Sequence, residues 1–316
     1  MNKIENYLEG VKTVGITGHR RPDGDCIGSC LGLYNYLTKN YPELSVSLYL
    51  ESIADKFVFL KNSDKIIFNT EKDEEFDLFI VLDSSDLERI GETVKYFDKA
   101  KKTLCIDHHI SNNNFAMENV VDAKLSSASE LLYMMLDEDK VDKYVAEALY
   151  LGIVHDSGVF KYSNTSYNTM AIAGKLMEKG IDFTSIIDDT FYTKTYVQNQ
   201  ILGRALLESV VFYDGKCIFS VVKKDEFDFY NITSADLDGV VEQLRITKGV
   251  EVAIFMYETE PMEYKISLRS KSEVDVSKVA EYFGGGGHIR AAGVMMHGTV
   301  YDVINNLSEQ ISLQLG

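Results

Sequence analysis

The sequence has no apolar run long enough to cross a membrane. A membrane-spanning helix needs about 20 mostly apolar residues, and no run in the 316 residues approaches that length. The first residues, 1–5, also lack the basic and then apolar pattern of a secretory signal. We therefore expect a soluble, cytoplasmic protein that does not associate with membranes.

Cysteine is scarce and scattered. The four cysteines are Cys26, Cys30, Cys105 and Cys217. Cys26 and Cys30 lie four residues apart and could form half of a zinc site, but no second pair completes it. We interpret all four as reduced residues that pack in the interior.

Positive charge is also in short supply. The chain carries 32 basic and 49 acidic residues, and its net charge is −17. A protein that coats long nucleic acid depends on many contacts between basic side chains and phosphates, so we expect no binding to long duplexes. The negative net charge does not exclude a short polyanionic substrate that is held at one local site. Carboxylates that bind cations would also contribute to the negative count.

The first half of the chain alternates apolar runs with helical patterns. The runs are almost continuously hydrophobic, which predicts strands of a parallel sheet covered on both faces. These strands are expected at 12–17, 45–50, 77–82 and 101–106. Helices are expected at 26–39, 127–136 and 142–155.

The first of these helices has two notable features. Asp25 stands where a helix N-cap is expected. Gly28 and Gly32 are one turn apart, and glycines at that spacing would let the helix lie close to the sheet, at some cost in helix propensity.

A polar, helix-like segment separates the two halves of the chain. We place the first domain at 1–187, a linker helix at 188–207 and the second domain at 208–316. In the second domain the patterns predict strands at 216–222, 251–257, 264–269 and 292–296. They predict helices at 235–244, at 276–283 and at the C-terminus.

Four polar blocks interrupt the first domain at strand or helix ends. Asp107-His108-His109 follows one predicted strand, a block from His19 to Asp25 follows another, Asp83 follows a third, and Asp156 ends a helix. Ligands of open α/β sheets bind at the carboxyl ends of the strands. The blocks are therefore expected to converge there, although they are far apart in sequence.

Each block alone has an ordinary explanation, such as a turn or a helix cap. Together, Asp23, Asp25, Asp83 and Asp156 would repel one another and raise one another's pKa values. Two divalent cations would relieve that repulsion. Ligation by aspartate and histidine without cysteine favours Mn²⁺ over other first-row ions or Mg²⁺, and two close metals suit in-line phosphoryl displacement.

A glycine run marks the second domain. Gly284-Gly285-Gly286-Gly287-His288 follows a predicted helix and lies between apolar segments, which argues against a loose linker. Consecutive glycines can bring backbone N–H groups close to an anion. Arg269 and Arg290 could add charge there. The run is not a Walker-type loop, because the Lys-Ser/Thr pair is missing.

The blocks together resemble the motifs of the DHH–DHHA1 phosphoesterases. The matching stretches of the first domain lie at 19–29, 81–83, 107–109 and 152–160. Those of the second domain lie at 267–270, 275–276 and 284–293. Within the family, the set is most similar to the standalone nano-RNases that also act as phosphatases on 3′-phosphoadenosine 5′-phosphate.

The resemblance implies an α/β protein with the active site in a cleft between two domains. A parallel-sheet DHH domain with helices on both faces would be linked to a smaller α/β DHHA1 domain. One Mn²⁺ would be held by His19, Asp23 and Asp83, and a second by Asp25, Asp83, His108 and Asp156. His109 would lie near the phosphate, with Asp107 orienting an imidazole.

The resemblance also implies the substrate-binding residues. Arg269, His288 and the backbone of Gly284, Gly285, Gly286 and Gly287 would receive the terminal phosphate or base of the substrate. Arg245 is a weaker candidate for the same task. One position departs from the family pattern, because His155 stands where threonine is common. We expect it to pack or to support a ligand.

The expected function is metal-dependent hydrolysis of short RNA oligonucleotides to nucleoside 5′-monophosphates, together with removal of the 3′-phosphate from 3′-phosphoadenosine 5′-phosphate. The alternatives are a cyclic di-AMP or pApA phosphodiesterase, a pyrophosphatase, or a catalytically silent nucleotide-binding regulator. The silent regulator is disfavoured because every expected metal ligand is present. The sequence does not decide between a monomer and a homodimer.

Overall fold

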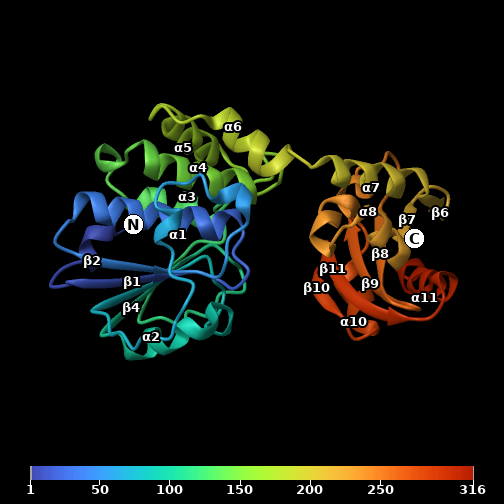
Figure 1. The fold of residues 1–316 in the computed structure, drawn as a ribbon, viewed down its shortest axis with the longest axis horizontal. Coiled ribbons are helices and arrows are strands. Elements are labelled where there is room, and N and C mark those ends of the chain that lie inside the picture. Colours follow the sequence, from blue (N-terminus) through green and yellow to red (C-terminus); the bar gives the residue numbers. More distant parts are fainter. Residues whose placement is uncertain (1, 316) are drawn as a thin grey trace. The chain divides into compact units, whose positions relative to one another are not determined.

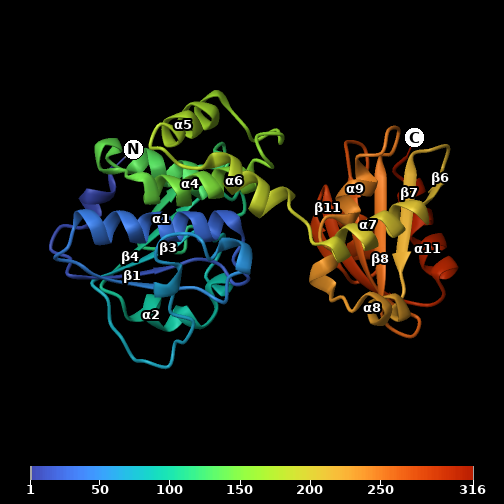
Figure 2. The ribbon, with the colours of Figure 1, turned by 45° about the horizontal axis from the view of Figure 1, so that its top comes forward.

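The computed structural model describes residues 2–315, and the chain forms two compact units (Figures 1 and 2). The units divide between Thr193 and Lys194, inside the predicted linker segment. A short π-helix, η6 (Asp188–Tyr192), belongs to the first unit, and α7 (Tyr196–Leu207) belongs to the second. No helix of residues 2–315 is both long and apolar enough to cross a bilayer.

A five-stranded sheet organises the first unit. Its strands are β1 (Thr13–Thr17), β2 (Ser45–Tyr49), β3 (Leu78–Leu82), β4 (Lys102–Asp107) and β5 (Glu118–Val121). Their order is β2-β1-β3-β4-β5, and every neighbouring pair is parallel. The parallel sheet is confirmed. Strand β5 was not predicted, because its four residues include an acid and an amide and form no apolar run.

Helices cover both faces of this sheet, as predicted. Figure 1 shows α1, α3 and α4 on one side and α2 on the other. The helices are α1 (Gly24–Asn40), α2 (Val94–Lys99), α3 (Ala128–Met135), α4 (Lys143–Asp156), α5 (Tyr167–Met177) and α6 (Phe183–Ile187). Short 3₁₀ helices are η1 (Ile4–Tyr7), η2 (Asp55–Phe57), η3 (Ser63–Lys65), η4 (Glu88–Thr93) and η5 (Glu138–Lys140).

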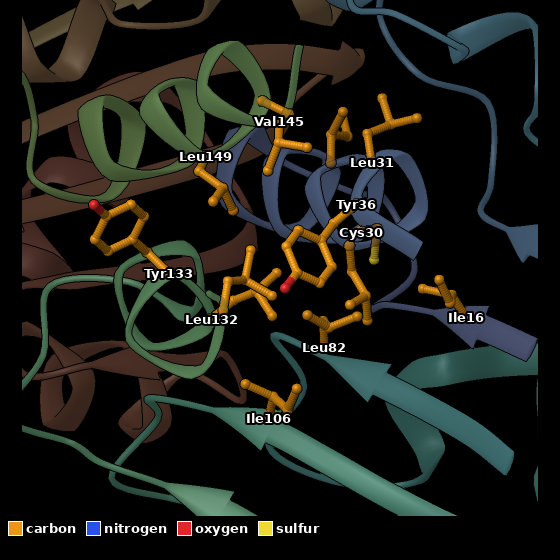
Figure 3. Packing of buried hydrophobic residues seen from close by; sticks show 14 of the residues in the cluster. Ile16, Cys30, Leu31, Tyr36, Leu82, Ile106, Leu132, Tyr133, Val145 and Leu149 are labelled. Carbon is orange, nitrogen blue, oxygen red and sulfur yellow. The ribbon is translucent and has the colours of Figure 1, made fainter. Parts of the chain in front are cut away.

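The apolar interior of the first unit lies on both sides of the sheet. The larger cluster joins strand residues such as Leu82 and Ile106 with Leu31 of α1, Leu132 of α3 and Leu149 of α4 (Figure 3). The smaller cluster, on the α2 side, is mainly aromatic and contains Tyr49, Phe76, Phe79, Tyr96 and Phe97. Packing on two faces explains why the strands are hydrophobic along their whole length.

The glycines of α1 were predicted to face the sheet, but in the structure they face α4. A Cβ on Gly28 would lie 2.4 Å from the backbone oxygen of Ala148 and 2.8 Å from the backbone nitrogen of Gly152. A Cβ on Gly32 would lie 2.7 Å from a methyl group of Leu149. The glycines therefore allow α1 and α4 to approach closely, because only a missing side chain leaves room for the backbone of α4.

A six-stranded mixed sheet organises the second unit. Its strands are β6 (Val210–Phe212), β7 (Cys217–Val222), β8 (Val252–Glu260), β9 (Glu263–Ser270), β10 (Gly286–His288) and β11 (Ala291–His297). Their order is β10-β11-β9-β8-β7-β6. The β7–β8 pair is parallel and the other pairs are antiparallel.

Two apolar clusters lie on opposite faces of the second sheet. One joins strand residues with α10 (Val276–Tyr282) and α11 (Val300–Ser312), and the other joins them with α7 and α9 (Val240–Arg245). A further helix is α8 (Lys224–Tyr230).

The prediction of a single helix at 235–244 was wrong. A 3₁₀ turn, η7 (Ser234–Leu237), precedes α9 in its place. Gly239 separates the two with a φ of 85°, a conformation that favours glycine and ends a helix.

Candidate functional site

Six side chains that lie far apart in sequence meet at the carboxyl edge of the first sheet. His19 follows β1, Asp83 follows β3, and His108 follows β4 directly. Asp25 lies in the first turn of α1, and Asp156 is the last residue of α4. The sixth, Asp23, precedes α1. The convergence expected at this edge is therefore present in the structure.

Asp83 lies at the centre of the group. Its Oδ1 atom is 3.5 Å from His108 Nε2 and its Oδ2 atom is 3.4 Å from His19 Nε2. The residue is only 2% exposed, and its buried Oδ1 has no hydrogen-bond partner in the described chain. Its φ of 54° is rare for a residue with a side chain. A buried carboxylate oxygen without a donor, on a strained backbone, is a place where a cation fits.

Asp25 is fully buried and is held by the N-terminus of α3. Its Oδ2 accepts a hydrogen bond of 2.6 Å from the backbone N–H of Ala128, and its Oδ1 accepts one of 3.0 Å from that of Ser129. Gly152 of α4 makes room for it, because a Cβ there would lie 2.6 Å from Asp25 Oδ1. Two backbone donors at a helix N-terminus orient the carboxylate and favour its charged form.

Asp23, not Asp25, is the N-cap of α1. Its Oδ1 accepts from the backbone N–H groups of Asp25 and Cys26, at 3.1 Å each. The predicted cap at Asp25 was wrong because the helix begins earlier, at Gly24, which places Asp25 inside its first turn. The side chain of Asp23 is 58% exposed and its Oδ1 lies 3.7 Å from His19 Nε2, at the rim of the group.

His108 faces three carboxylates. Its Nε2 lies 3.0 Å from Asp156 Oδ2 and 3.8 Å from Asp25 Oδ2, in addition to its contact with Asp83. Its other ring nitrogen lies 3.4 Å from the backbone oxygen of Leu125, which holds the ring in place. Asp156 stands at the C-terminus of α4, where the partial negative charge of the helix end disfavours a carboxylate.

The pKa values of these groups show how strongly the site attracts positive charge. Burial raises the pKa of Asp25 well above its usual value, and repulsion by Asp83 and Asp156 raises it further. Burial is also the main reason for the raised pKa of Asp156. Burial alone would lower the pKa of His108, but its contacts with Asp156 and Asp83 raise that pKa to about 12.

His19 behaves in the same way. Burial opposes its charged form, but Asp23 and Asp83 raise its pKa to about 12. Asp83 responds in the opposite direction, because the facing imidazoles of His108 and His19 outweigh its burial and lower its pKa. Without a metal, the carboxylates draw protons onto the imidazoles. A divalent cation supplies the same positive charge and leaves the imidazoles neutral, as metal ligation requires.

The potential ligand atoms form three overlapping groups that could each hold a cation. Within each group the ligand atoms all lie within 4.8 Å of one another. The groups are His19, Cys26 and Asp83; Asp83, His108 and His109; and Asp25, His108 and Asp156. Asp83 and His108 each belong to two of them, so neighbouring cations could share a ligand. The chemistry of the donors fits divalent metal binding.

His109 and Asp107 form a separate pair beside this group. Asp107 is fully buried, and its Oδ1 lies 2.7 Å from His109 Nδ1. Its Oδ2 accepts a hydrogen bond of 2.7 Å from the amide of Asn112. The hydrogen bond between His109 and Asp107 is the main reason why the pKa of His109 is raised. The aspartate therefore orients the imidazole of His109 and not that of His108.

His155 packs against aromatic rings. Its ring centre lies 5.3 Å from that of Phe57 and 5.7 Å from that of Phe191. Its Nε2 lies 2.9 Å from the hydroxyl of Thr190, whose own hydrogen is donated to the backbone oxygen of Ile186. Burial, together with repulsion by Lys56, lowers the pKa of His155 to about 4. These contacts describe a neutral, packed histidine, one of the two roles expected for it.

In the second unit, Arg269 and His288 of the predicted substrate residues lie on one face of the sheet. His288 on β10 pairs with Ala291 on β11, which pairs with Arg269 on β9. Gly286 pairs with Gly293 in the same register. Directly paired residues of antiparallel strands point to the same face, so Arg269 and His288 lie on either side of Ala291, next to the row that contains Gly286 and Gly293. The row leaves the backbone accessible.

The glycine run forms part of an edge strand as well as a loop. Gly286, Gly287 and His288 make up β10, while Gly284 and Gly285 lie between it and α10. Gly284 has a φ of 82°, and a Cβ on Gly285 would lie 2.3 Å from the backbone oxygen of Gly293. Close backbone packing in the hairpin therefore requires glycine, independently of any ligand.

Two arginines named from the sequence have partners within the second unit. Arg245 forms an ion pair with Glu242 one turn earlier in α9. Arg290 donates to the backbone oxygens of Ser272 and Val274. Both guanidinium groups thus stabilise local structure.

Sequence reasoning missed two residues of the site. Asn112 holds the carboxylate of Asp107, and Cys26 places its sulfur within 4.8 Å of ligand atoms of His19 and Asp83. Cys26 packs in the apolar core, as predicted, and its closeness in sequence to the expected ligands at 19–25 was the one hint of its second contact. Asn112 gives no such hint in the sequence. It contacts Asp107 only because the loop after β4 folds back toward the end of that strand.

Both units of the chain are similar to known proteins. Residues 13–153 match the model of the DHH family, N-terminal domain, and residues 214–315 match that of the DHHA1 domain. A bifunctional oligoribonuclease and PAP phosphatase NrnA of Bacillus subtilis is 28% identical over 90% of this chain and 90% of its own length. A probable protein of the same name from Streptococcus mutans is 29% identical, over 97% of this chain and 99% of its own.

A solved structure has the same architecture. An exopolyphosphatase-related protein from Bacteroides fragilis superposes with a TM-score of 0.87 at 26% identity, and covers 98% of this chain and 94% of its own.

Proposed function

Because this chain belongs to the DHH family and carries a DHHA1 domain, we propose that it hydrolyses short RNA oligonucleotides to nucleoside 5′-monophosphates. We further propose that it removes the 3′-phosphate of 3′-phosphoadenosine 5′-phosphate (PAP). The observation that carries the proposal is the buried group of carboxylates and imidazoles around Asp83. The names of the relatives with which the chain aligns over most of its length support this choice of substrates.

The proposed cofactor is a pair of Mn²⁺ ions that share Asp83. His19, Asp23 and Asp83 would hold one ion. Asp25, Asp83, His108 and Asp156 would hold the other. Two cations at such a site lower the pKa of a bound water and stabilise charge on the attacking and leaving oxygens. The exposed rim at Asp23 leaves one side of the group open to a substrate.

His109 is proposed to contact the phosphate. Asp107 binds its Nδ1, so Nε2 is directed away from the aspartate and is the ring atom available to a ligand. The residue is partly exposed, with 29% of its side chain accessible. The hydrogen bond with Asp107 raises the pKa of His109, and Nε2 of this ring could donate a hydrogen bond to a phosphate oxygen and pass a proton to the leaving oxygen.

The second unit is proposed to bind the end of the substrate that is not cleaved. Arg269 and His288 would supply charge and hydrogen bonds, and the glycines from Gly284 to Gly287 would allow backbone N–H groups to approach an anion. Because the chain is acidic overall, binding would depend on these few local contacts. That requirement suits a substrate of a few nucleotides.

A substrate panel tests the proposal. With Mn²⁺ present, we would measure turnover of RNA dimers to pentamers, PAP, pApA, cyclic di-AMP and pyrophosphate. We expect turnover of the short RNAs and PAP. Turnover confined to cyclic di-AMP and pApA, or to pyrophosphate, would reassign the substrate. No turnover with a full complement of bound metal would reveal a silent nucleotide-binding protein.

Two variants test the metal site directly. Asp25→Ala and His108→Ala should each lose turnover and bound manganese together, measured by elemental analysis of the purified protein. Asp64→Ala and His297→Ala serve as matched controls, because both residues are exposed and form surface ion pairs. Full activity in Asp25→Ala and His108→Ala would contradict the two-metal proposal.

A further inference from the structure

The three arginines of residues 1–193 lie together beside the metal-ligating group. They are Arg20, Arg21 and Arg89. Arg20 and Arg21 follow His19 directly, and the backbone N–H of Arg20 donates a hydrogen bond of 2.7 Å to the backbone oxygen of Arg89. All three line a cavity of about 390 Å³, and Glu51 is the fourth residue lining it.

This cluster of arginines is locally basic although the chain as a whole is acidic. The protein has a net charge of −17, yet the residues lining this cavity carry three positive charges and one negative. Among residues 2–315, the side chains of Arg20, Arg21 and Arg89 form no ion pair, whereas Arg204 and Arg245 of the second unit do. Clustered cations repel one another unless an anion lies between them. The cavity is therefore suited to an anionic ligand.

The backbone positions these arginines. Arg21 has a φ of 54°, and its N–H donates a hydrogen bond of 2.8 Å to Glu51 Oε2, which ties the carboxylate to the backbone of this loop. Gly91, with a φ of 62°, lets the Arg20 side chain lie across it, since a Cβ there would be 2.9 Å from Arg20 Cδ. These contacts fix the loop that carries Arg20 and Arg21 next to His19.

A larger cavity adjoins the arginines. It measures about 600 Å³, shares Arg20 and Glu51 with the smaller cavity, and is also lined by His19. Its walls include Tyr49, Ile67 and Phe68, and hydroxyl groups come from Thr17, Thr70 and Thr93. Phe68 is 59% exposed. The lining also includes Glu92, which accepts a hydrogen bond from the hydroxyl of Thr70. A lining of mixed apolar and polar groups, in a volume of this size, suits a small organic ligand such as a nucleoside.

We infer that the two cavities form a second nucleotide subsite of the proposed phosphoesterase. The guanidinium groups of Arg20, Arg21 and Arg89 bind a phosphate that is not cleaved, and the adjoining cavity accepts the nucleoside attached to it. Guanidinium groups match phosphate oxygens in geometry and charge. His19 lies at the boundary between this subsite and the metal-ligating group, so one substrate can reach both.

The inference rests on the proposed function and adds a preference within it. Substrates with a second phosphate next to the cleaved one should bind better than those without it. The clearest pair is pApA and ApA, which share the internal phosphodiester and differ only in the terminal 5′-phosphate.

Kinetics with a triple variant test the subsite. In Arg20→Gln/Arg21→Gln/Arg89→Gln, we expect the KM for pApA to rise by about tenfold or more, because the phosphate loses its charged partners. The KM for ApA should change by less than about twofold. The kcat should be nearly unchanged for both substrates, since the arginines are proposed to contact a phosphate that is not cleaved and so to act mainly on binding. The salt dependence of pApA binding should also weaken, with a log–log slope that is smaller by roughly 0.7 for each phosphate that the variant no longer neutralises.

A matched control separates local from global charge. Lys39→Gln/Lys99→Gln/Lys175→Gln removes the same three charges from surface ion pairs of the first unit that line neither cavity. It should leave the KM values for both substrates unchanged. An equal change in both substrates, or the same change in the control, would overturn the subsite. Phe68→Ala should raise the KM for both pApA and ApA, because both carry the nucleoside that the larger cavity is proposed to accept.

A binding experiment keeps this test independent of turnover. Calorimetric titration with PAP in EDTA measures binding when no divalent cation is available. Wild-type protein should bind PAP, and the arginine triple variant should bind it at least about tenfold more weakly. If neither pApA nor ApA is cleaved by the wild type, the proposed function fails and the titration still decides the subsite. Equal PAP affinity in wild type and triple variant would refute it.

Discussion

Two buried carboxylates, one in each unit, are held by backbone N–H groups, but their pKa values shift in opposite directions. Asp25 accepts from Ala128 and Ser129, and its pKa is raised, first by burial and then by the facing Asp83 and Asp156. Glu251 accepts from Ser272, Glu273 and Val274, and these hydrogen bonds outweigh its burial and lower its pKa.

The difference between the two carboxylates lies in their charged neighbours. Glu251 stabilises a loop and needs nothing further, because its charge is met by N–H donors. Asp25 has donors of its own, yet it stands among other acids that leave the site short of positive charge. Buried acids that repel one another are costly to fold, so their presence indicates a ligand. Asp25 is therefore part of a group that suits cation binding, whereas Glu251 holds a loop of its own unit.

The largest expected effect comes from Asp83→Asn. Because Asp83 faces His19 and His108 at once, loss of its charge should lower kcat by roughly a thousandfold or more, through weaker metal ligation and transition-state stabilisation. Steady-state assays with PAP and elemental analysis for manganese would measure this. Asp64→Ala should behave like the wild type. Wild-type turnover in Asp83→Asn would remove the basis for contrasting the two units.

A second prediction concerns cation binding and stability. Mn²⁺ at about 100 times its dissociation constant should stabilise the first unit by about 2.7 kcal/mol, since it binds the folded ligand group. It should leave the second unit unchanged. Scanning calorimetry with Mn²⁺ and with EDTA would resolve the two, and Asp25→Ala should lose the response. A shift of equal size in both units would show that the cation acts elsewhere.

Glu251→Gln tests the other half of the comparison. Replacing the carboxylate by an amide places an NH₂ group against backbone donors and should cost the second unit about 2 kcal/mol of unfolding free energy. The folded-state pKa of Glu251 is lowered, so its stabilisation is present above the ordinary glutamate value and disappears as the pH falls through the folded-state pKa. Chemical denaturation across that acid range should show a flatter pH dependence in Glu251→Gln. An unchanged profile would contradict the role given to Glu251.

The smallest effect is expected for Arg245→Gln. Its guanidinium already pairs with Glu242, so removing it should change the KM for PAP by less than about twofold, as is usual when a local ion pair is removed. Arg269→Ala, on the sheet face with His288, should raise that KM by several fold. A larger effect in Arg245→Gln than in Arg269→Ala would place the substrate against α9 in preference to the sheet face.

Much of the fold was predictable because the patterns are local. The almost continuous hydrophobicity of 12–17, 77–82 and 101–106 predicted a parallel sheet with both faces covered, and the structure confirms it. Positions that depend on a partner far away in sequence were predicted less well. Gly28 was assigned to the wrong neighbour, since the sequence cannot say whether a helix face meets the sheet or another helix.

The glycine run illustrates the same limit within the second unit. Four glycines before His288 were interpreted as an anion-binding loop, but Gly286 and Gly287 also form an edge strand against β11. A glycine run carries no alternation of side chains from which a strand could be predicted. Only the position of β11 decides that pairing.

The sequence by itself determined which polar residues would meet at the edge of the first sheet. Aspartates and histidines at strand ends predict a site, because parallel strands end at a common edge. The tertiary structure alone decided the tasks of those residues: Asp23 caps α1, Asp25 is held by α3, and Asp107 orients His109 through a contact that Asn112 supports. The physical reason is that a carboxylate's task follows from the donors and charges around it, and those come from segments that only folding brings together.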